Sequence, residues 1–325
     1  LEDDFYTNNS NGSVDVVYTI VPVSNQGGVE VLGGEFTLTV TVNSEPKVAS
    51  QSAIICSGEI INLNLNEGII SGGTSFKYTI DAIDESGLTR TGPASYETGS
   101  DALNGDSFIN ETSAPVDVVY TITPYIEIDG AAADCVGESF EVTVRVNPAP
   151  VVVDQVQTVN SRNPIEVTLG AATNTIAISN YRIQGIDRPD LTPGTNNRVV
   201  GDVISADGLL NDTFTNTESV SKNVIYSIVP VSAEGCDGDE FTVTVTIRPE
   251  PVVADQVLTV CNEQALGVTL NGSDNGVSIA HYNITGINSN GLTAGGANAI
   301  IGNTYSSDVL EDDFYTNNSN GSVDV

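Results

Sequence analysis

Histidine and acidic residues set the range of chemistry open to this chain. His281 is the only histidine among 325 residues, so a three-histidine zinc site and an HExxH motif are both excluded. A Ser-His-Asp triad repeated along the chain is excluded as well, because His281 aligns with Asn180 in an internal repeat. We interpret His281 as an ordinary strand or turn residue. A carboxylate-only glycosidase would need its paired carboxylates grafted onto one copy of a repeated module, so we expect no enzymatic activity.

One short motif places an aspartate at regular positions. The pattern Leu-x-x-Asp-x-[Phe/Tyr]-x-Asn begins at Leu1, Leu103, Leu209 and Leu310. Its aspartates are Asp4, Asp106, Asp212 and Asp313. Carboxylates suit Ca²⁺, and calcium between domains would rigidify a rod, which makes these residues weak metal candidates. An aspartate before a strand more often forms a turn with its own backbone, so we favour the turn and expect no cofactor.

Internal repeats must position these side chains. The segment LEDDFYTNNSNGSVDV recurs letter for letter at residues 1–16 and 310–325, an offset of 309 residues. Within that period, VDVVYTIVP, VDVVYTITP and KNVIYSIVP place Tyr18, Tyr120 and Tyr226 at 102- and 106-residue intervals. A second block recurs as EFTLTVTVN, SFEVTVRVN and EFTVTVTIR, each followed by a proline-marked junction. Three units of roughly 103 residues therefore make up one longer repeat.

The prolines give the domain boundaries. We expect two whole units, 46–149 and 150–250, with the closing part of a unit at 1–45 and the opening part at 251–325. The two end pieces are complementary, so successive copies laid end to end would complete a domain. The sequence thus predicts a segment of a longer array.

Each unit has the pattern of a β-sandwich. Phe241, Val243, Val245 and Ile247 alternate with polar residues, and the same alternation recurs from Phe140 and from Phe36. We expect these apolar faces to be buried, and we interpret the tyrosine of each VVYTI block as a core residue, with a tyrosine-corner analogue as the alternative. Six to eight short strands in roughly 103 residues predict an all-β fold of tandem immunoglobulin-like domains in an extended array.

Cysteines occupy two positions in the aligned units. Cys56, Asn160 and Cys261 share an early position, and Val31, Cys135 and Cys236 share a late one. Pairing within a domain joins Cys56 to Cys135, pairing across a junction joins Cys236 to Cys261, and four free thiols are the third alternative. Strands running outward from the Pro249 junction would carry Cys236 and Cys261 beyond the separation that a disulfide allows. We therefore prefer the pair Cys56 and Cys135, consistent with an oxidising exterior.

The charge balance excludes several partners. Ten Lys and Arg against 43 Asp and Glu give a net charge of −33. Nucleic acids and anionic membrane surfaces require a basic face, so neither is an expected partner. No apolar run is long enough to span a bilayer, so we expect no membrane insertion.

The ordered blocks resemble a known family. The run VIYSIVPVSAEGCDGDEFTVTVTIRPEPVVADQVLTVCNEQALGVTL, followed by HYNITGINSNGLTAGG, is similar to the PKD-like repeats of very large secreted proteins of Bacteroidetes. The resemblance extends over all units, although the first unit lacks the Gly-Cys element. It implies an extracellular protein attached to the outer membrane and delivered by the type IX secretion system. Its partners would be adjacent repeats of the same chain and the gliding machinery, with surface glycans or abiotic surfaces contacted through regions outside this segment.

The resemblance and the repeats together predict a mechanical role. We expect a non-catalytic stalk segment of a repetitive cell-surface adhesin that serves surface attachment and gliding motility. The alternatives are a polysaccharide-binding module of a secreted protein and a self-assembling surface fibre. A polysaccharide-binding surface usually needs exposed aromatic residues. The chain has no Trp, and several of its 11 Tyr and 8 Phe are expected in the core, which disfavours the polysaccharide-binding alternative.

The same resemblance suggests one modification. The triplets Asp106-Ser107-Phe108 and Asp212-Thr213-Phe214 are similar to the short Asp-Ser/Thr sites that Bacteroidetes O-glycosylate. Ser107 and Thr213 are weak glycosylation candidates on this basis. A solvated strand start is the simpler interpretation of both triplets.

Overall fold

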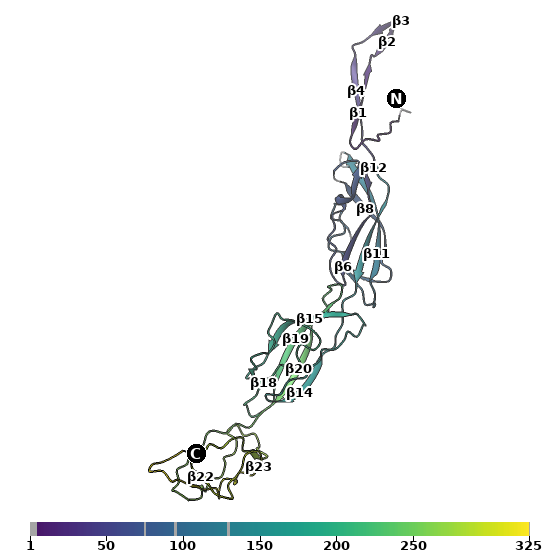
Figure 1. Cartoon of the computed structure of the whole chain (residues 1–325). Coiled ribbons are helices and arrows are strands. Elements are labelled where there is room, and N and C mark those ends of the chain that lie inside the picture. Colours follow the sequence, from purple (N-terminus) through teal and green to yellow (C-terminus); the bar gives the residue numbers. More distant parts are fainter. Residues whose placement is uncertain (1–4, 75, 94–95, 129–130, 325) are drawn as a thin grey trace. The chain divides into compact units, whose positions relative to one another are not determined.

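The computed structural model describes residues 5–74, 76–93, 96–128 and 131–324. Over those residues the secondary structure is almost entirely β, with one 3-10 turn at Leu65–Gly68 (Figure 1). The all-β expectation is confirmed. No helix in the described ranges is long and apolar enough to cross a membrane.

The chain divides into two compact units. Unit 1 comprises Leu1–Val152, Ala171–Ser179 and Pro230–Asp239, and unit 2 comprises Val153–Gly170, Asn180–Val229 and Glu240–Val325. Unit 1 therefore includes one sheet built from residues 51–147 and a loop that comes from much later in the sequence. A second sheet is built from residues 155–248.

The first sheet is organised around a long strand. Its members are β6 (Gln51–Cys56), β8 (Lys77–Asp84), β11 (Val116–Ile128), β12 (Ala131–Val136) and β13 (Phe140–Asn147). Strand β11 pairs antiparallel with β8, β12 and β13, whereas β6 lies parallel to β13 with Gln51 opposite Val142. Two short antiparallel pairs accompany this sheet, β5 (Lys47–Val48) with β7 (Ile69–Ser71) and β9 (Thr89–Arg90) with β10 (Phe108–Ile109).

The second sheet repeats this plan. Its order is β14-β20-β19-β15-β17, and β14 again lies parallel to the last strand, β20. The strands are β14 (Gln155–Asn160), β15 (Ile178–Asp187), β17 (Val203–Ile204), β19 (Lys222–Ser232) and β20 (Phe241–Arg248). A short pair, β16 (Thr192–Pro193) with β18 (Phe214–Thr215), corresponds to β9 with β10.

Alternating side chains build the core of both sandwiches. Phe241, Val243, Val245 and Ile247 of β20 are all buried, and Phe140, Val142, Val144 and Val146 of β13 are buried in the same way. Because successive residues of a strand point to opposite faces, the intervening Thr and Arg side chains are more exposed. The expected inward faces of these two strands are confirmed.

The amino-terminal hairpin behaves differently. Strand β1 (Val14–Ile20) pairs with β4 (Phe36–Val42), and β2 (Val23–Gln26) pairs with β3 (Val29–Leu32), which forms the two-stranded purple ribbon of Figure 1. Phe36 is 51% exposed and Leu38 40%, although their counterparts in β13 and β20 are buried. The expected burial from Phe36 to Val42 is therefore wrong for this chain, because no second layer of the described residues covers the hairpin.

Residues 251–324 hold only four two-residue strands. These are β21 (Tyr282–Asn283), β22 (Thr293–Ala294), β23 (Thr304–Tyr305) and β24 (Tyr315–Thr316). The strands β22, β23 and β24 lie 101 residues after β16, β17 and β18, and β21 lies 101 residues after Tyr181 and Arg182 of β15. Strand β21 pairs with β23 as β15 pairs with β17. The segment thus reproduces the pairings of the opening part of the second sandwich.

Glycines hold the β-hairpins against the junction prolines. A Cβ atom added to Gly137 would lie 2.0 Å from the carbonyl oxygen of Pro46, and one added to Gly238 would lie 1.9 Å from that of Pro150. Only glycine allows such a close approach of two backbones. The loop between β12 and β13 and the loop between β19 and β20 therefore each pack on the proline that opens their own repeat.

Candidate functional site

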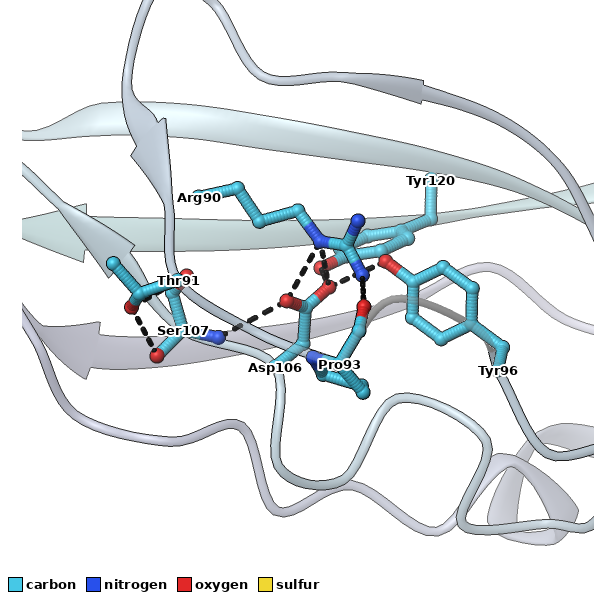
Figure 2. Close-up of polar contacts among 7 residues, drawn as sticks. All are labelled: Arg90, Thr91, Pro93, Tyr96, Asp106, Ser107 and Tyr120. Atoms are coloured by element: carbon cyan, nitrogen blue, oxygen red, sulfur yellow. Dashed lines mark hydrogen bonds and ion pairs between the residues drawn. The ribbon is translucent and has the colours of Figure 1, made fainter.

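A buried carboxylate lies beside the central strand of the first sandwich. Asp106 is fully buried and accepts hydrogen bonds from the hydroxyls of Tyr120 (2.7 Å) and Tyr96 (2.5 Å). Arg90 donates its Nε to both carboxylate oxygens, at 2.8 and 3.0 Å. Figure 2 shows the three donors converging on Asp106 from strands β9 and β11 and from the loop that carries Tyr96. A buried charge needs such partners, and here it fastens a loop to the sheet.

Arg90 is itself fixed by the same cluster. Its Nη2 donates to the carbonyl of Pro93 at 2.6 Å, and its guanidinium lies 4.7 Å from the centre of the Tyr96 ring. Burial, together with the bonded Asp106 carboxylate, raises the pKa of Tyr120 and of Tyr96 well above that of a free tyrosine. Both phenols therefore stay protonated and act as donors over the physiological pH range.

The second sandwich has a simpler form of this anchor. Asp212 is buried and accepts a 2.6 Å bond from the hydroxyl of Tyr226. The backbone N–H of Arg198 reaches both carboxylate oxygens at 3.1 and 3.2 Å, while its Nε donates to the carbonyl of Gly208 instead. Burial raises the pKa of Asp212, and the bond from Tyr226 partly offsets that rise.

Asp313 continues the series. It is buried, and it accepts from the backbone N–H of Ala299 at 2.9 and 3.1 Å, the bond that Arg198 makes 101 residues earlier. Each aspartate follows a turn in which its own N–H bonds the motif leucine, so the expected turn is present in the backbone. Asp4 lies outside the described residues.

The carboxylates are not arranged as a metal site. Tyrosine, arginine and backbone donors occupy the side chains of Asp106 and Asp212, which argues against the calcium alternative for these two residues. In the ranges that the structure describes, no group of three or more His, Cys, Asp or Glu is placed to hold a metal ion. His281 is exposed and adjoins β21.

Two further residues of the motif have structural roles that the sequence analysis missed. The motif aromatic packs edge-to-face on the central tyrosine, with ring centres 6.4 Å apart for Phe108 and Tyr120 and again for Phe214 and Tyr226. The motif asparagine, Asn110, donates to the carbonyls of Ala114 and Val146 and thereby joins a loop to the last strand. The recurrence of the asparagine in all four motifs was the signal that could have revealed this role.

The same asparagine contact recurs along the chain. Asn216 donates to Val220 and Ile247, and Asn8 donates to Gly12 and Val42. Asn317 makes the equivalent loop contact with Gly321. The last strand of a unit is therefore fastened by its motif asparagine in each case where that strand is present.

The glycosylation candidates lie at different depths. Ser107 is only 6% exposed, and its hydroxyl is bonded to that of Thr91 at 2.7 Å (Figure 2). A glycan on Ser107 does not fit this folded sandwich, which corrects that candidate. Thr213 is half-buried and forms an isolated β-bridge with Pro164. Its O-glycosylation stays a prediction.

The disulfide differs from the expected pair. Cys56 bonds Cys236, with Cα atoms 5.5 Å apart, and Cys135 and Cys261 are free. Pairing of Cys56 with Cys135 is therefore wrong. Cys56 ends β6 beside Asn147, at the end of the sandwich that leads into the Pro148 junction, whereas Cys135 lies in β12 beside Ile126. Cys236 lies in the loop between β19 and β20, which packs on Pro150 through Gly238, and this loop brings Cys236 to Cys56.

An asparagine secures each junction that follows a whole unit. Asn174 donates its Nδ2 to the carbonyl of Ala149 at 2.7 Å and accepts at Oδ1 from the N–H of Val151 at 3.2 Å. Asn275 makes the same two bonds, at 2.8 and 3.2 Å, with Glu250 and Val252. Each amide therefore bridges the junction proline and fixes the linker to the repeat that follows.

Asn275 also reaches back across its junction. Its Nδ2 lies 3.0 Å from the carbonyl of Thr217 and 3.1 Å from that of Glu218. Both carbonyls belong to the loop that follows the motif asparagine Asn216. One side chain thus joins the end of one repeat, the linker and the start of the next.

Comparisons with known proteins agree with this architecture. A family model for the PKD-like domain matches residues 2–46, 53–150 and 192–251. Among curated proteins, none matches the sequence.

Solved structures give weaker likenesses. Drosophila N-cadherin EC1-4 is 11% identical over 94% of this chain and 75% of its own, with a TM-score of 0.20. Chicken VE-cadherin EC1-2 is 16% identical over 61% of this chain and 97% of its own, with a TM-score of 0.19. The CFA/I enterotoxigenic E. coli adhesin CfaE is 10% identical over 64% of this chain and all of its own, with a TM-score of 0.20. At these TM-scores, the likenesses support no statement about the function of this chain.

The family model matches well over half of the sequence, in segments that include the repeated strands and the motif aspartates of the first and second sandwiches. The chain therefore belongs to the PKD-like domain family.

Proposed function

We propose that this chain is a non-catalytic stalk segment of a very large, repetitive cell-surface adhesin. The observation that carries the proposal is the repetition of one junction design, in which Asn174 and Asn275 make the same bonds across equivalent prolines. A linker fixed in this way limits how freely neighbouring repeats bend. A binding module would need no such control of its neighbours, whereas a stalk depends on it.

The domain division follows from the same repetition. In this proposal the whole repeats are 46–149 and 150–250, and residues 1–45 and 251–325 are the closing and opening parts of repeats that successive copies complete. Stability would then be close to a sum over repeats and their junctions. A net charge of −33 over 325 residues would keep parallel stalks apart and soluble.

Extracellular exposure is part of the proposal. The bond between Cys56 and Cys236 requires an oxidising compartment, which supports export of the chain. The resemblance to Bacteroidetes repeats adds delivery by type IX secretion, attachment at the outer membrane and a role in gliding. Adhesive contact with glycans or abiotic surfaces would then belong to regions outside this segment.

Small-angle X-ray scattering of the full chain tests the stalk directly. At about 3.3 Å per residue, strands of about ten residues give each whole repeat a length of about 35–45 Å with its junction. We expect a rod-like distance distribution whose maximum grows by that amount when one more repeat is added. A compact distribution that does not lengthen with added repeats would contradict the proposal.

An Asn174→Ala, Asn275→Ala variant provides the matched comparison. Loss of both amide bridges frees the linkers without touching either core, so we expect the distance distribution to broaden while strand content stays unchanged. Circular dichroism checks the strand content. An unchanged distribution would show that the amides do not limit bending.

A further inference from the structure

The disulfide connects two different positions of successive repeats. Cys56 occupies the early position of the repeat 46–149, and Cys236 occupies the late position of the repeat 150–250. The early cysteine of one repeat is thus bonded to the late cysteine of the next. Cys236 is fully buried, and its N–H bonds the Ser232 hydroxyl at 3.0 Å, so the loop that carries it is ordered around the bond.

The same rule accounts for the remaining positions. The early position of the second repeat is Asn160, and the late position of the repeat after it corresponds to Val31, so neither side of that junction has a cysteine. The early position of the third repeat is Cys261, and the late position of the repeat after it corresponds to Cys135 of a following copy. A single rule therefore uses every cysteine and leaves none unmatched.

We propose that Cys261 forms a disulfide with Cys135 of the copy that follows it in the array. The proposal rests on the proposed stalk function, because it requires successive copies of the 309-residue period. Two of every three junctions would then carry a covalent cross-link. The junction that follows the repeat 150–250, whose early position is Asn160, would carry none.

The local structure on the early side matches the bonded pair. The N–H of Cys56 bonds the side chain of Glu59 at 2.9 Å, and the N–H of Cys261 bonds that of Gln264 at 3.3 Å. Each cysteine also begins a hydrogen-bonded turn. The N–H of Glu59 bonds the carbonyl of Cys56, and the N–H of Gln264 bonds that of Cys261. Cys261 is exposed, so its thiol is open to a partner.

The late side matches as well. Gly238, two residues after Cys236, packs on Pro150, and Gly137, two residues after Cys135, packs on Pro46 in the same way. The N–H of Gly238 also bonds the carbonyl of Pro230 in β19, and the N–H of Gly137 bonds that of Pro124 in β11. The loop of Cys135 is therefore held against its own opening junction, where the preceding repeat ends.

The chemistry is ordinary thiol–disulfide exchange. The thiols of Cys261 and Cys135 together lose two protons and two electrons as the S–S bond forms. Glutathione disulfide accepts them and leaves as two molecules of glutathione. An oxidised disulfide oxidoreductase would serve the same purpose during export.

A tandem chain tests the pairing. Residues 1–325 continued by residues 17–250 of a second copy contain the junction between Cys261 and the second Cys135. We would fold this chain with glutathione disulfide, block free thiols by alkylation and map peptides without reduction. The expected result is a peptide linking Cys261 to Cys135, with Cys56 linked to Cys236 in both copies and one free thiol, the Cys135 of the first copy.

Matched serine variants assign the copies. Cys135→Ser in the second copy should expose Cys261 to alkylation, whereas Cys135→Ser in the first copy should leave Cys261 protected and remove the last free thiol. Alkylation of Cys261 in the unsubstituted tandem chain, or a link between Cys56 and Cys135, would overturn the proposal. Absence of the link between Cys56 and Cys236 would overturn the rule itself.

Scattering separates this proposal from the stalk function. A tandem chain that lengthens as a rod while Cys261 stays free would refute the disulfide and leave the stalk intact. A compact particle that contains the disulfide would refute the stalk instead.

Discussion

The buried aspartates of the two whole sandwiches are stabilised by different partners. Asp106 has a charged partner, Arg90, and two tyrosine hydroxyls, whereas Asp212 has Tyr226 and the backbone N–H of Arg198. Charge neutralises charge in the first sandwich, but only neutral donors meet the buried carboxylate in the second. The comparison shows that the repeat preserves the tyrosine–carboxylate bond, while the means of balancing the charge has diverged.

Removing the charge should give the largest difference between the two sandwiches. Asp106→Asn leaves the partly buried Arg90 without its counter-charge, and we expect it to destabilise the first sandwich by about 3 kcal/mol. The matched Asp212→Asn keeps an acceptor for Tyr226 and removes a desolvated charge, so its cost should be about 1 kcal/mol or less. Hydrogen exchange of β13 and β20 in the full chain measures both. Equal losses would show that Arg90 adds nothing to the anchor.

Removing the hydroxyl should reverse the order. Tyr226→Phe leaves the Asp212 carboxylate with the Arg198 amide, and we expect a cost of about 2 kcal/mol. Tyr120→Phe leaves Asp106 with Arg90 and Tyr96, so its cost should be about 1 kcal/mol. The midpoints of denaturant-dependent exchange in each sandwich compare them. A larger loss from Tyr120→Phe would contradict this account of the two sites.

The pH dependence should separate the sandwiches further. Burial raises the pKa of Asp212 above its unfolded value of 3.8, so between 3.8 and the raised pKa the folded sandwich holds a proton that the unfolded chain has released. The contribution of Asp212 is therefore most favourable at low pH and is lost as pH rises through that window. We expect the difference in unfolding free energy between the parent and Asp212→Asn to shift with pH in this direction. A difference that is independent of pH from 3.5 to 7 would refute it.

The smallest effect concerns the residue after each aspartate. Ser107→Ala removes a buried hydroxyl that is bonded to Thr91, with an expected cost of about 1 kcal/mol to the first sandwich. Thr213→Ala removes a half-buried side chain and should cost about 0.5 kcal/mol or less. Intact-mass spectra of secreted material provide the companion measurement, with no glycan on Ser107. A glycosylated Ser107 peptide from the folded protein would contradict its buried position.

The fold was accessible from the sequence because its periodicity is local. The alternation from Phe140 and from Phe241 specifies which face of a strand is buried, and repetition confirms the register without any knowledge of the partner strand. The same alternation predicted that Phe36 and Leu38 are buried, and both are exposed. Burial depends on a second layer as well as on the pattern of one strand, and the alternation carries no information about whether that layer is present.

The sites were less accessible because they depend on contacts between distant residues. The motif marked Asp106 and Asp212 as special, but nothing in their neighbourhood indicated that a tyrosine 14 residues later would bond each carboxylate. The predicted disulfide pairing was wrong for a related reason. Outward-running strands separate Cys236 from Cys261, as expected. The sequence carries no sign, however, that the loop of Cys236 lies at the opening end of its own repeat, next to Cys56.

The parallel pairing of the first and last strands has a mechanical consequence. Strand β6 begins at Gln51 opposite Val142, and β13 ends at Asn147 opposite Cys56, so the chain enters and leaves this strand pair at opposite ends. Strands β14 and β20 are arranged in the same way. Tension applied along the backbone therefore pulls the two strands in shear and loads all of their hydrogen bonds together. A hairpin pulled from its open end would instead lose its bonds one at a time.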